Sequence, residues 1–435
     1  MKRVLLSLLC VTNISAAMAQ NPHTTEGTYN PSIYVISERH TEHRNTLHAA
    51  IIDDYTETAR TGFQQSHHPQ FILATPDNRF SLALGGMVNL RTSYDFNNAV
   101  GNIDFVTADI AVPGSYANRQ RVMMDASTSR LFLKAIINTP CVGRIVIYSD
   151  MDFRGGEQFS YIPRLRSAYI QLCGLTLGRD VTTFCDLNAA PTTIDFEGPN
   201  AYNFRFTEMI RYEHSFLRNH LTLGIAAEVP SVSATYGDFF SPIMQRVPDG
   251  IAYVQYAWGE NRASHLRVSG VIRDMYLHNN TTDENTTQLG WGVQLSGHIS
   301  ITRWVDLYMN GVYGKGITPY IQDLTGLPYD CAYNPQEPTR MQTMPMWGWQ
   351  AAAQVNIIPK VMWVAAGYSM VGLEKHNGFL SDNEYRQGDY LFVNAFWKIA
   401  RNFTVAAEYL HGSRENMDTL KESANRVSIM AQYNF

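Results

Sequence analysis

From residue 80 onward, hydrophobic and polar side chains alternate along the chain. Phe80, Leu82 and Leu84 begin one parity, Ser81 and Ala83 begin the other, and the alternation continues through residue 96. A strand of a soluble sandwich usually has about 5 to 6 residues, whereas a tilted strand that crosses a membrane needs about 9 to 11. The length of this alternating run therefore predicts a transmembrane strand.

The same pattern recurs to the end of the chain, where Val427, Ile429 and Phe435 share one face. Together with residues 80 to 96 and this C-terminal segment, similar segments make sixteen, near 128–138, 143–154, 162–172, 174–184, 204–216, 220–229, 249–258, 264–276, 287–300, 303–316, 345–358, 361–373, 387–398 and 401–413. An even count is typical of a closed bacterial barrel. The pattern predicts an all-β fold, a 16-stranded antiparallel transmembrane β-barrel over residues 80–435 with a short N-terminal periplasmic extension.

The predicted connections alternate in length, which supports this interpretation independently. Seven are short, at 138–142, 173–174, 217–219, 259–263, 301–302, 359–360 and 399–400, and eight are long, at 97–127, 155–161, 185–203, 230–248, 277–286, 317–344, 374–386 and 414–422. Outer-membrane barrels have short periplasmic turns and longer extracellular loops. The lengths therefore place both ends of the barrel on the periplasmic side.

The first 79 residues have a different pattern. Lys2 and Arg3 precede an apolar stretch and a small-residue motif ending at Ala19, which predicts a signal peptide over residues 1–19. Residues 20–79 hold no alternating segment and are predicted to be a periplasmic extension with one helix near residues 46–60. His40 and His43 have helical spacing, but such clusters near a terminus are more often solvated than metal-bound, so no metal is expected.

Charge narrows the function classes. The formal net charge is −5, and removing Lys2 and Arg3 makes it −7. An acidic chain without basic runs is unlike a nucleic-acid-binding protein, so no nucleic-acid partner is expected. Aromatic residues make up 12% of the chain, which suits an apolar surface bordered by amphipathic rings. The expected surroundings are outer-membrane lipid and lipopolysaccharide, and the expected location is the bacterial outer membrane.

Alternation also assigns side chains to the lipid or to the lumen. On four strands we place apolar or aromatic residues such as Ile147, Ser167, Tyr169 and Phe206 outside. The intervening residues then face the lumen, and they include Arg144, Arg154, Arg164, Arg166, Arg205, Arg211, Arg267 and Arg273 together with Tyr148, Asp150 and Asp152. The lumen is therefore predicted to be wet and rich in arginine.

The basic residues are 27 Arg against 7 Lys. Arginine binds carboxylate or phosphate through two parallel hydrogen bonds, so a ring of arginines in a narrow pore favours anions. We take the first six of these arginines, Arg144, Arg154, Arg164, Arg166, Arg205 and Arg211, as candidate pore-lining and solute-binding residues. The alternative is that each arginine pairs with a nearby acid and only braces the wall.

The third long segment, residues 185–203, is predicted to fold inward and to narrow the channel. Its acids Asp186, Asp195 and Glu197 would then lie opposite the lumenal arginines and create a transverse field. An ordinary surface loop is the alternative. The four cysteines beyond the signal peptide are too few for a disulfide scaffold, but Cys185 and Cys331 both lie in predicted extracellular loops, so a bridge between them is possible.

Several motifs resemble those of the DcaP-like trimeric porins. They are Asp150-Met151-Asp152-Phe153-Arg154-Gly155, Pro163-Arg164-Leu165-Arg166, Leu177-Gly178-Arg179, Thr183-Phe184-Cys185-Asp186-Leu187 and Pro191 to Asn200. This resemblance implies a homotrimer of sixteen-stranded barrels for passive diffusion of small anionic, dicarboxylate-like solutes. Cys185 stands where that family is expected to have a small residue. Phe435 resembles the terminal aromatic residue that outer-membrane assembly recognises.

Other functions fit less well. A FadL-type channel for hydrophobic solutes would need an apolar pocket, and a TonB-dependent receptor would need a larger plug and 22 strands. A hydrolase would need a positioned serine and histidine, but His214 shares the lipid-facing parity and no G-x-S-x-G motif is present. We therefore expect no enzyme activity and no cofactor, with a structural or adhesive barrel as a remaining alternative.

Overall fold

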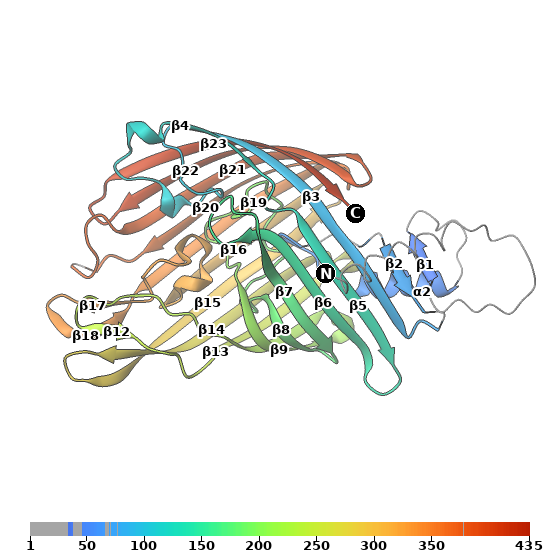
Figure 1. The fold of residues 1–435 in the computed structure, drawn as a ribbon, viewed down its shortest axis with the longest axis horizontal. Helices are drawn as coiled ribbons and strands as arrows, with labels where there is room; N and C mark the ends of the chain where they lie inside the picture. The colour runs from blue at the N-terminus through green and yellow to red at the C-terminus, as the bar shows by residue number, and fades with distance from the viewer. Residues whose placement is uncertain (1–33, 38–45, 66–68, 70, 76, 377) are drawn as a thin grey trace, which may run out of the picture.

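The structure, a computed structural model, describes residues 34–37, 46–65, 69, 71–75, 77–376 and 378–435. Within these ranges the long strands form a closed antiparallel barrel with 16 strand positions (Figure 1). Its strands are β3 (Phe80–Phe96), β4 (Gln120–Asp125), β5 (Arg130–Thr139), β6 (Gly143–Gly155), β7 (Ile162–Leu172), β8 (Leu175–Val181), β9 (Phe206–Phe216), β10 (Leu221–Glu228), β13 (Asp249–Trp258), β14 (Ser264–Asn279), β15 (Glu284–Thr302), β16 (Val305–Lys315), β19 (Pro345–Ile358), β20 (Met362–Leu373), β21 (Tyr385–Ala400), β22 (Phe403–Asn416) and β23 (Lys421–Asn434).

Shorter helices and strands lie at the two ends of the barrel. The N-terminal part contributes β1 (Tyr34–Ser37), α2 (Thr46–Glu57) and β2 (Phe71–Ala74), and the loops contribute β11 (Ala234–Thr235), β12 (Phe240–Pro242), β17 (Cys331–Asn334) and β18 (Glu337–Thr343). Single 3-10 turns lie at η2 (Thr107–Asp109), η3 (Tyr116–Asn118), η4 (Leu217–Asn219), η5 (Glu260–Arg262), η6 (Thr318–Tyr320) and η7 (Gln322–Leu324). None of the described helices is long and apolar enough to cross a membrane.

The barrel closes where its first strand pairs with its last. β23 runs antiparallel to β3 from Asn425↔Phe96 to Asn434↔Met87. Beyond this ladder, Phe435 exchanges two backbone hydrogen bonds with Gly86, at 2.9 and 3.0 Å. Next along the same edge, β2 pairs with β3 from Phe71↔Leu84 to Ala74↔Ser81. The closing ladder therefore leaves no free strand edge within the membrane span.

The second strand position is divided between two segments. β5 pairs with the first half of β3 and β4 pairs with the second half. The prediction placed a strand at 128–138 and treated residues 97–127 as loop, so β4 was missed. The ladder breaks at residues 126–129, where the Ser127 amide donates to the Asp125 carboxylate (3.0 Å). The alternation seen in the sequence is interrupted at this break, which is why β4 could not be joined to β5.

Alternation correctly predicts most lipid-facing side chains. Val268 and Ile272 of β14 are more than half exposed, while Arg267 and Arg273, which flank them in the sequence, are buried. Exposed aromatic residues gather near both ends of the strands, at Tyr94, Trp291, Tyr313 and Trp349 toward the long loops and at Phe216, Tyr256, Trp397 and Tyr433 toward the short turns. Two such rings are typical of the two membrane interfaces.

Three predicted orientations are wrong. A β-bulge interrupts the pairing of β6 with β7, where Asp150↔Ser167 is followed by Met151↔Leu165, so Arg166 is the extra residue. A bulge reverses side-chain parity beyond it. Ser167 and Tyr169, predicted to face lipid, are therefore buried inside the barrel. Phe206, also predicted outside, is the first residue of β9 and packs against Phe204 (ring centroids 5.1 Å apart).

The predicted helix near 46–60 corresponds to α2 (Thr46–Glu57). Its Ile51 and Tyr55 are buried and pack with Ala83 of β3 and Ile136 of β5, two residues of the lumenal parity. Residues 46–65 of the N-terminal region therefore enter the barrel. The predicted signal peptide, residues 1–19, and the His40 and His43 pair lie outside the described residues.

The possible bridge between Cys185 and Cys331 is absent, because all four cysteines of the described residues are free. Cys185 packs with Phe63 and Tyr202, whereas Cys331 packs with Phe240 and Met275 in a separate cluster. Burial raises the pKa of the Cys185 thiol to about 12. Cys141 and Cys173 are exposed in short turns.

These positions predict which thiols react and on which side of the membrane. A 5 kDa maleimide-polymer should leave the protein unmodified on intact cells, because Cys141 and Cys173 lie in the predicted periplasmic turns and Cys185 and Cys331 are buried. After extraction into mild detergent, two of the four thiols should react, and all four should react after denaturation. Mobility on denaturing gels measures the number of polymers attached.

A matched variant, Gln336→Cys, tests the opposite side. Gln336 is exposed in the hairpin between β17 and β18, so its cysteine should react on intact cells. Reaction of the wild-type protein on intact cells would reverse the assigned orientation.

Candidate pore constriction

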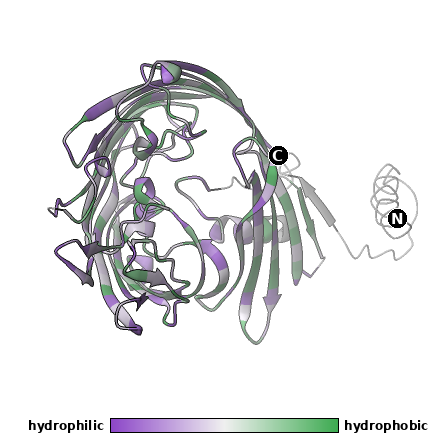
Figure 2. Ribbon diagram, turned by 60° about the vertical axis from the view of Figure 1, so that its left-hand side comes forward, coloured by the Kyte–Doolittle hydropathy of each residue, from purple (hydrophilic) through white to green (hydrophobic). Residues whose placement is uncertain are grey.

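Residues 182–205, between β8 and β9, fold into the barrel and are almost entirely buried, and we call them the constriction loop. Figure 2 shows such non-strand segments inside the ring of strands. The loop is held by polar side chains from the opposite wall. Asn203 accepts from Gln294 of β15 (2.9 Å) and Asn310 of β16 (3.0 Å), and Asn200 accepts from Ser369 of β20 (2.6 Å). The loop therefore spans the lumen.

Two further loops also turn inward, which the sequence analysis missed. Residues 97–119 meet residues 316–344 where Thr107 donates to the Asp323 carboxylate (2.6 Å). The Asp323 amide in turn donates to the Asn200 carbonyl (3.1 Å), which joins both loops to the constriction loop. The sequence did carry a signal for these inward loops, because they contain several large apolar residues. Five of these residues are fully buried in the structure: Phe105, Ile317, Tyr320, Ile321 and Leu324. Exposed extracellular loops rarely carry so many large apolar residues.

The predicted acids of the constriction loop have different partners. Asp186 accepts from His265 (2.9 Å) and Ser296 (2.8 Å) on the far wall. Although burial acts to raise its pKa, these bonds and the nearby His265 and Arg267 charges lower the pKa of Asp186 below its usual range. Asp186 therefore anchors the loop as a carboxylate.

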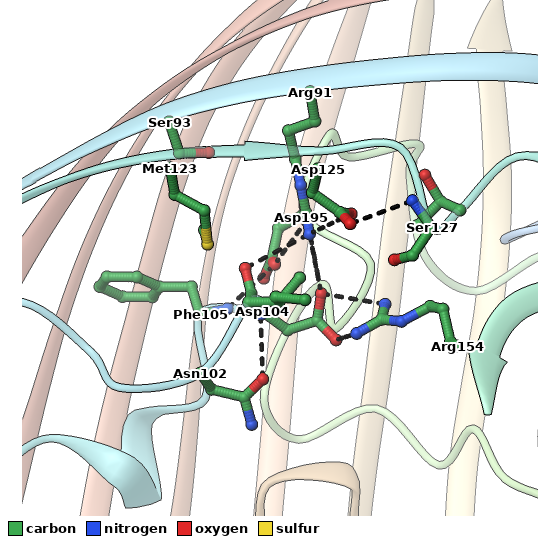
Figure 3. Close-up of polar contacts among 12 residues, drawn as sticks. Arg91, Ser93, Asn102, Asp104, Phe105, Met123, Asp125, Ser127, Arg154 and Asp195 are labelled. Atoms are coloured by element: carbon green, nitrogen blue, oxygen red, sulfur yellow. Dashed lines mark hydrogen bonds and ion pairs between the residues drawn. The ribbon is translucent and has the colours of Figure 1, made fainter. Parts of the chain in front are cut away.

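Asp195 and Glu197 lie in an acidic cluster with Asp104. Burial and the Asp104 charge raise the pKa of Asp195, and burial together with Asp104, Asp323 and Asp195 raises that of Glu197 well above its usual range. Facing this cluster are Arg91 of β3, whose Nη1 lies 3.7 Å from Asp195, and Arg154 of β6. Figure 3 shows Asp104 between the Arg91 and Arg154 guanidinium groups.

The arginines that pair with these acids and their neighbours include some that were not predicted. Arg91 donates to Asp104 and Asp125 (3.3 Å each), and Arg154 donates to Asp104 (3.1 Å). Arg426 of β23 donates to Asp95 (3.0 Å) and to two carbonyls of the 97–119 loop. Arg91 and Arg426 were not among the predicted site residues, although their parity on β3 and β23 could have identified them.

The other predicted arginines are also lumenal, and most are paired with acids. Arg164 makes two bonds to Asp152 (3.0 and 2.6 Å), and Arg166 lies 3.3 Å from the same carboxylate. Arg211 pairs with Asp180 (2.9 Å) and Glu213 (3.3 Å).

Two arginines have a different setting. Arg144 pairs with Asp54 and Glu57 of α2, so it holds the N-terminal helix. Arg205 stacks over the Tyr320 ring (4.8 Å) and donates to the Val229 carbonyl (3.3 Å). Ion pairs with acids therefore engage Arg154, Arg164, Arg166 and Arg211.

A cavity of about 410 Å³ lies between residues 55–65, the constriction loop and the wall formed by β3, β5, β6 and β20–β23. Among its described lining residues are four cations, Arg60, Arg130, Lys134 and Lys398, and no aspartate or glutamate. We call this cavity the basic chamber. Aromatic side chains complete it, with Trp363 and Phe396 stacked at 5.2 Å and Lys398 5.8 Å from the Trp363 ring centre.

A smaller cavity of about 240 Å³ lies on the other side of residues 60–61, and its lining includes both acids and arginines. Asp186 and Glu213 lie there with Arg60, Arg211 and Arg267. The basic chamber is therefore lined by four cations and by no carboxylate of its described lining residues, although one of these cations, Arg60, also pairs with Asp180.

Comparison with known proteins agrees with this architecture. The structure resembles the outer membrane channel DcaP of Acinetobacter baumannii, with a TM-score of 0.71 and 17% identity over 83% of this chain and 99% of that one. It also resembles an anion-selective porin from Comamonas acidovorans, with a TM-score of 0.53 and 12% identity over 82% of this chain and all of that one. The trimer form of OmpT from Vibrio cholerae matches with a TM-score of 0.50 and 12% identity over 82% and 99%.

No curated protein sequence matches the chain. The family model described as the porin subfamily matches residues 118–434, which is most of the chain. This match confirms the predicted porin resemblance, the location in the bacterial outer membrane and the expectation of a channel rather than an enzyme. The chain therefore belongs to the porin subfamily, and its barrel is an outer-membrane pore for passive diffusion.

Proposed function

We propose that this porin is a homotrimer that passes small hydrophilic anions of the dicarboxylate class through an arginine-lined pore narrowed by the constriction loop. The observation that carries the proposal is the basic chamber, where four cations and no described carboxylate line one cavity. The fold likeness to an anion-selective porin and to a trimeric porin is consistent with it.

Within this proposal, the pore arginines and the chamber cations have separate roles. Arg154, Arg164, Arg166 and Arg211 sit in ion pairs that position the wall and the loops. Lys398 lies at the wall of the chamber, above Trp363, outside these pairs. A cation in a narrow, low-dielectric passage attracts anions more strongly than the same cation on an open surface. Lys398 is therefore expected to contribute strongly to selectivity.

Replacing Lys398 should change ion selectivity in proportion to charge. Lys398→Gln should lower the anion-to-cation permeability ratio, and Lys398→Glu should lower it further. The measurement is the reversal potential of the trimer in planar bilayers under a salt gradient. Low ionic strength is required, because the Debye length is about 8 Å at physiological salt and about 30 Å at 0.01 M.

Lys421→Gln is the matched control. Lys421 is at the extracellular end of β23 and pairs with Asp389 (2.8 Å), away from the chamber. Its replacement should leave the permeability ratio unchanged. A cation-selective wild-type pore, or equal ratios for wild type and Lys398→Glu, would contradict the anion proposal.

Arg205 and Arg211 provide a second test. Arg205→Ala with Arg211→Ala removes two positive charges and leaves Asp180 with Arg60 as its remaining cationic partner among the ion pairs described. The lumen becomes more negative, so the permeability ratio should fall while the trimer stays resistant to heat in detergent. Selectivity at low salt and gel mobility before and after heating measure the two outcomes. An unchanged ratio would remove both arginines from the selectivity site.

A further inference from the structure

Residues 46–65 run inside the barrel, from the periplasmic end toward the constriction loop. We call α2 and residues 58–65 together the lumenal strap. The closing ladder β23–β3 contains none of these residues, so the barrel wall is complete without them. The strap is therefore an added occupant of the pore rather than a part of its wall.

The strap is held at its base by charge and by a small apolar contact. Asp54 and Glu57 pair with Arg144 of β6, the latter at 2.9 Å. Ile51 and Tyr55 cover Ala83 and neighbouring residues on the inner face of the wall.

Farther along, backbone carbonyls of the strap accept hydrogen bonds from cationic side chains of the pore wall. Thr58 O accepts from Lys134 (2.8 Å). Gln64 O accepts from both Arg130 (2.7 Å) and Arg166 (3.0 Å). Oxygen acceptors of the chain thus take positions where the oxygens of a passing anion could bind.

The tip of the strap docks on the constriction loop. The Phe63 amide donates to the Leu187 carbonyl (2.7 Å), and the Thr61 hydroxyl lies 3.2 Å from the Asn188 side-chain oxygen. The Phe63 ring is buried edge-on against Tyr202 (5.1 Å between centroids) and Phe204 (5.7 Å). The strap therefore bridges the space between the wall and the loop.

Gly62 makes this docking possible. Its φ of +106° is a conformation that side chains rarely adopt, and an added Cβ would lie 2.2 Å from the Leu187 carbonyl oxygen. Arg60 beside it pairs with Asp180, and Arg60 and Thr61 line both the basic chamber and the smaller cavity. The docked strap consequently separates two spaces of the lumen.

We propose that the lumenal strap is an autoinhibitory gate, which restricts the pore when docked on the constriction loop and widens it when released. Most of the contacts that hold it are hydrogen bonds and ion pairs, which water can replace on release. Among the described residues no disulfide fastens it. The proposal rests on the porin assignment and is independent of anion preference.

The first test releases the strap. Gly62→Ala places a methyl group against the Leu187 carbonyl, so the strap must move away from the constriction loop. Single-channel conductance should then rise by about twofold or more, because the narrowest section of a pore sets its conductance. Gly143→Ala is the matched control. Gly143 also has a positive φ, +72°, but an added Cβ meets nothing within 4 Å, so conductance should stay at the wild-type value.

The second test fastens the strap. Thr61→Cys with Asn188→Cys, in a Cys185→Ala background, places two thiols within reach of a disulfide. The oxidised trimer should show the low conductance without open excursions, and reduction should restore wild-type behaviour. Mass spectrometry of the linked peptide verifies the bond.

Three outcomes would overturn the gate. They are failure of the disulfide to form, equal conductance of the oxidised pair and Gly62→Ala, or a conductance of Gly62→Ala equal to that of Gly143→Ala. Ion selectivity recorded in the same bilayers separates this result from the anion proposal. A pore that gates but prefers cations would retain the gate and contradict only the anion preference.

Discussion

The pairing of β3 with β23 is the constraint on which the rest of the molecule depends. Lipid offers no hydrogen bonds to the edge of a strand, so the sheet must close into a barrel to be stable in a membrane. Closure turns one parity of every strand outward and the other inward. The outward set must be apolar, and the inward set is consequently where the charged residues of the spanning strands are collected.

These inward-facing charged residues explain why several long loops fold into the pore. Buried arginines such as Arg91 and Arg426 need carboxylates, since removing one partner of a buried pair costs about 3–5 kcal/mol. The 97–119 loop supplies Asp104, and the constriction loop supplies Asp195. The inward loops and the arginine wall thus stabilise one another through these ion pairs.

The strap extends the same principle to the N-terminal region. Its acids meet Arg144, its carbonyls meet Lys134, Arg130 and Arg166, and its one large aromatic side chain near the tip, Phe63, fits beside Tyr202. A segment with no role in the ladder is ordered by groups that the closed wall presents to it. Pore width and the filling of the pore are therefore separable properties of this chain.

The sequence by itself determined the strands, the number of strands in the closed barrel, the short turns and the lumenal face. The reason is that side-chain alternation with period two is a local property of an extended chain. Only the tertiary structure decided the exceptions and the partners. The bulge at Arg166, which turned Ser167 and Tyr169 inward, and the break that separated β4 from β5 depend on pairing with neighbouring strands. Which acid meets which arginine depends on loops distant in the chain, as in the bond between Thr107 and Asp323, which are 216 positions apart. The place of residues 46–65 inside the barrel was beyond any local pattern, because the groups that hold the strap converge only after the barrel has closed.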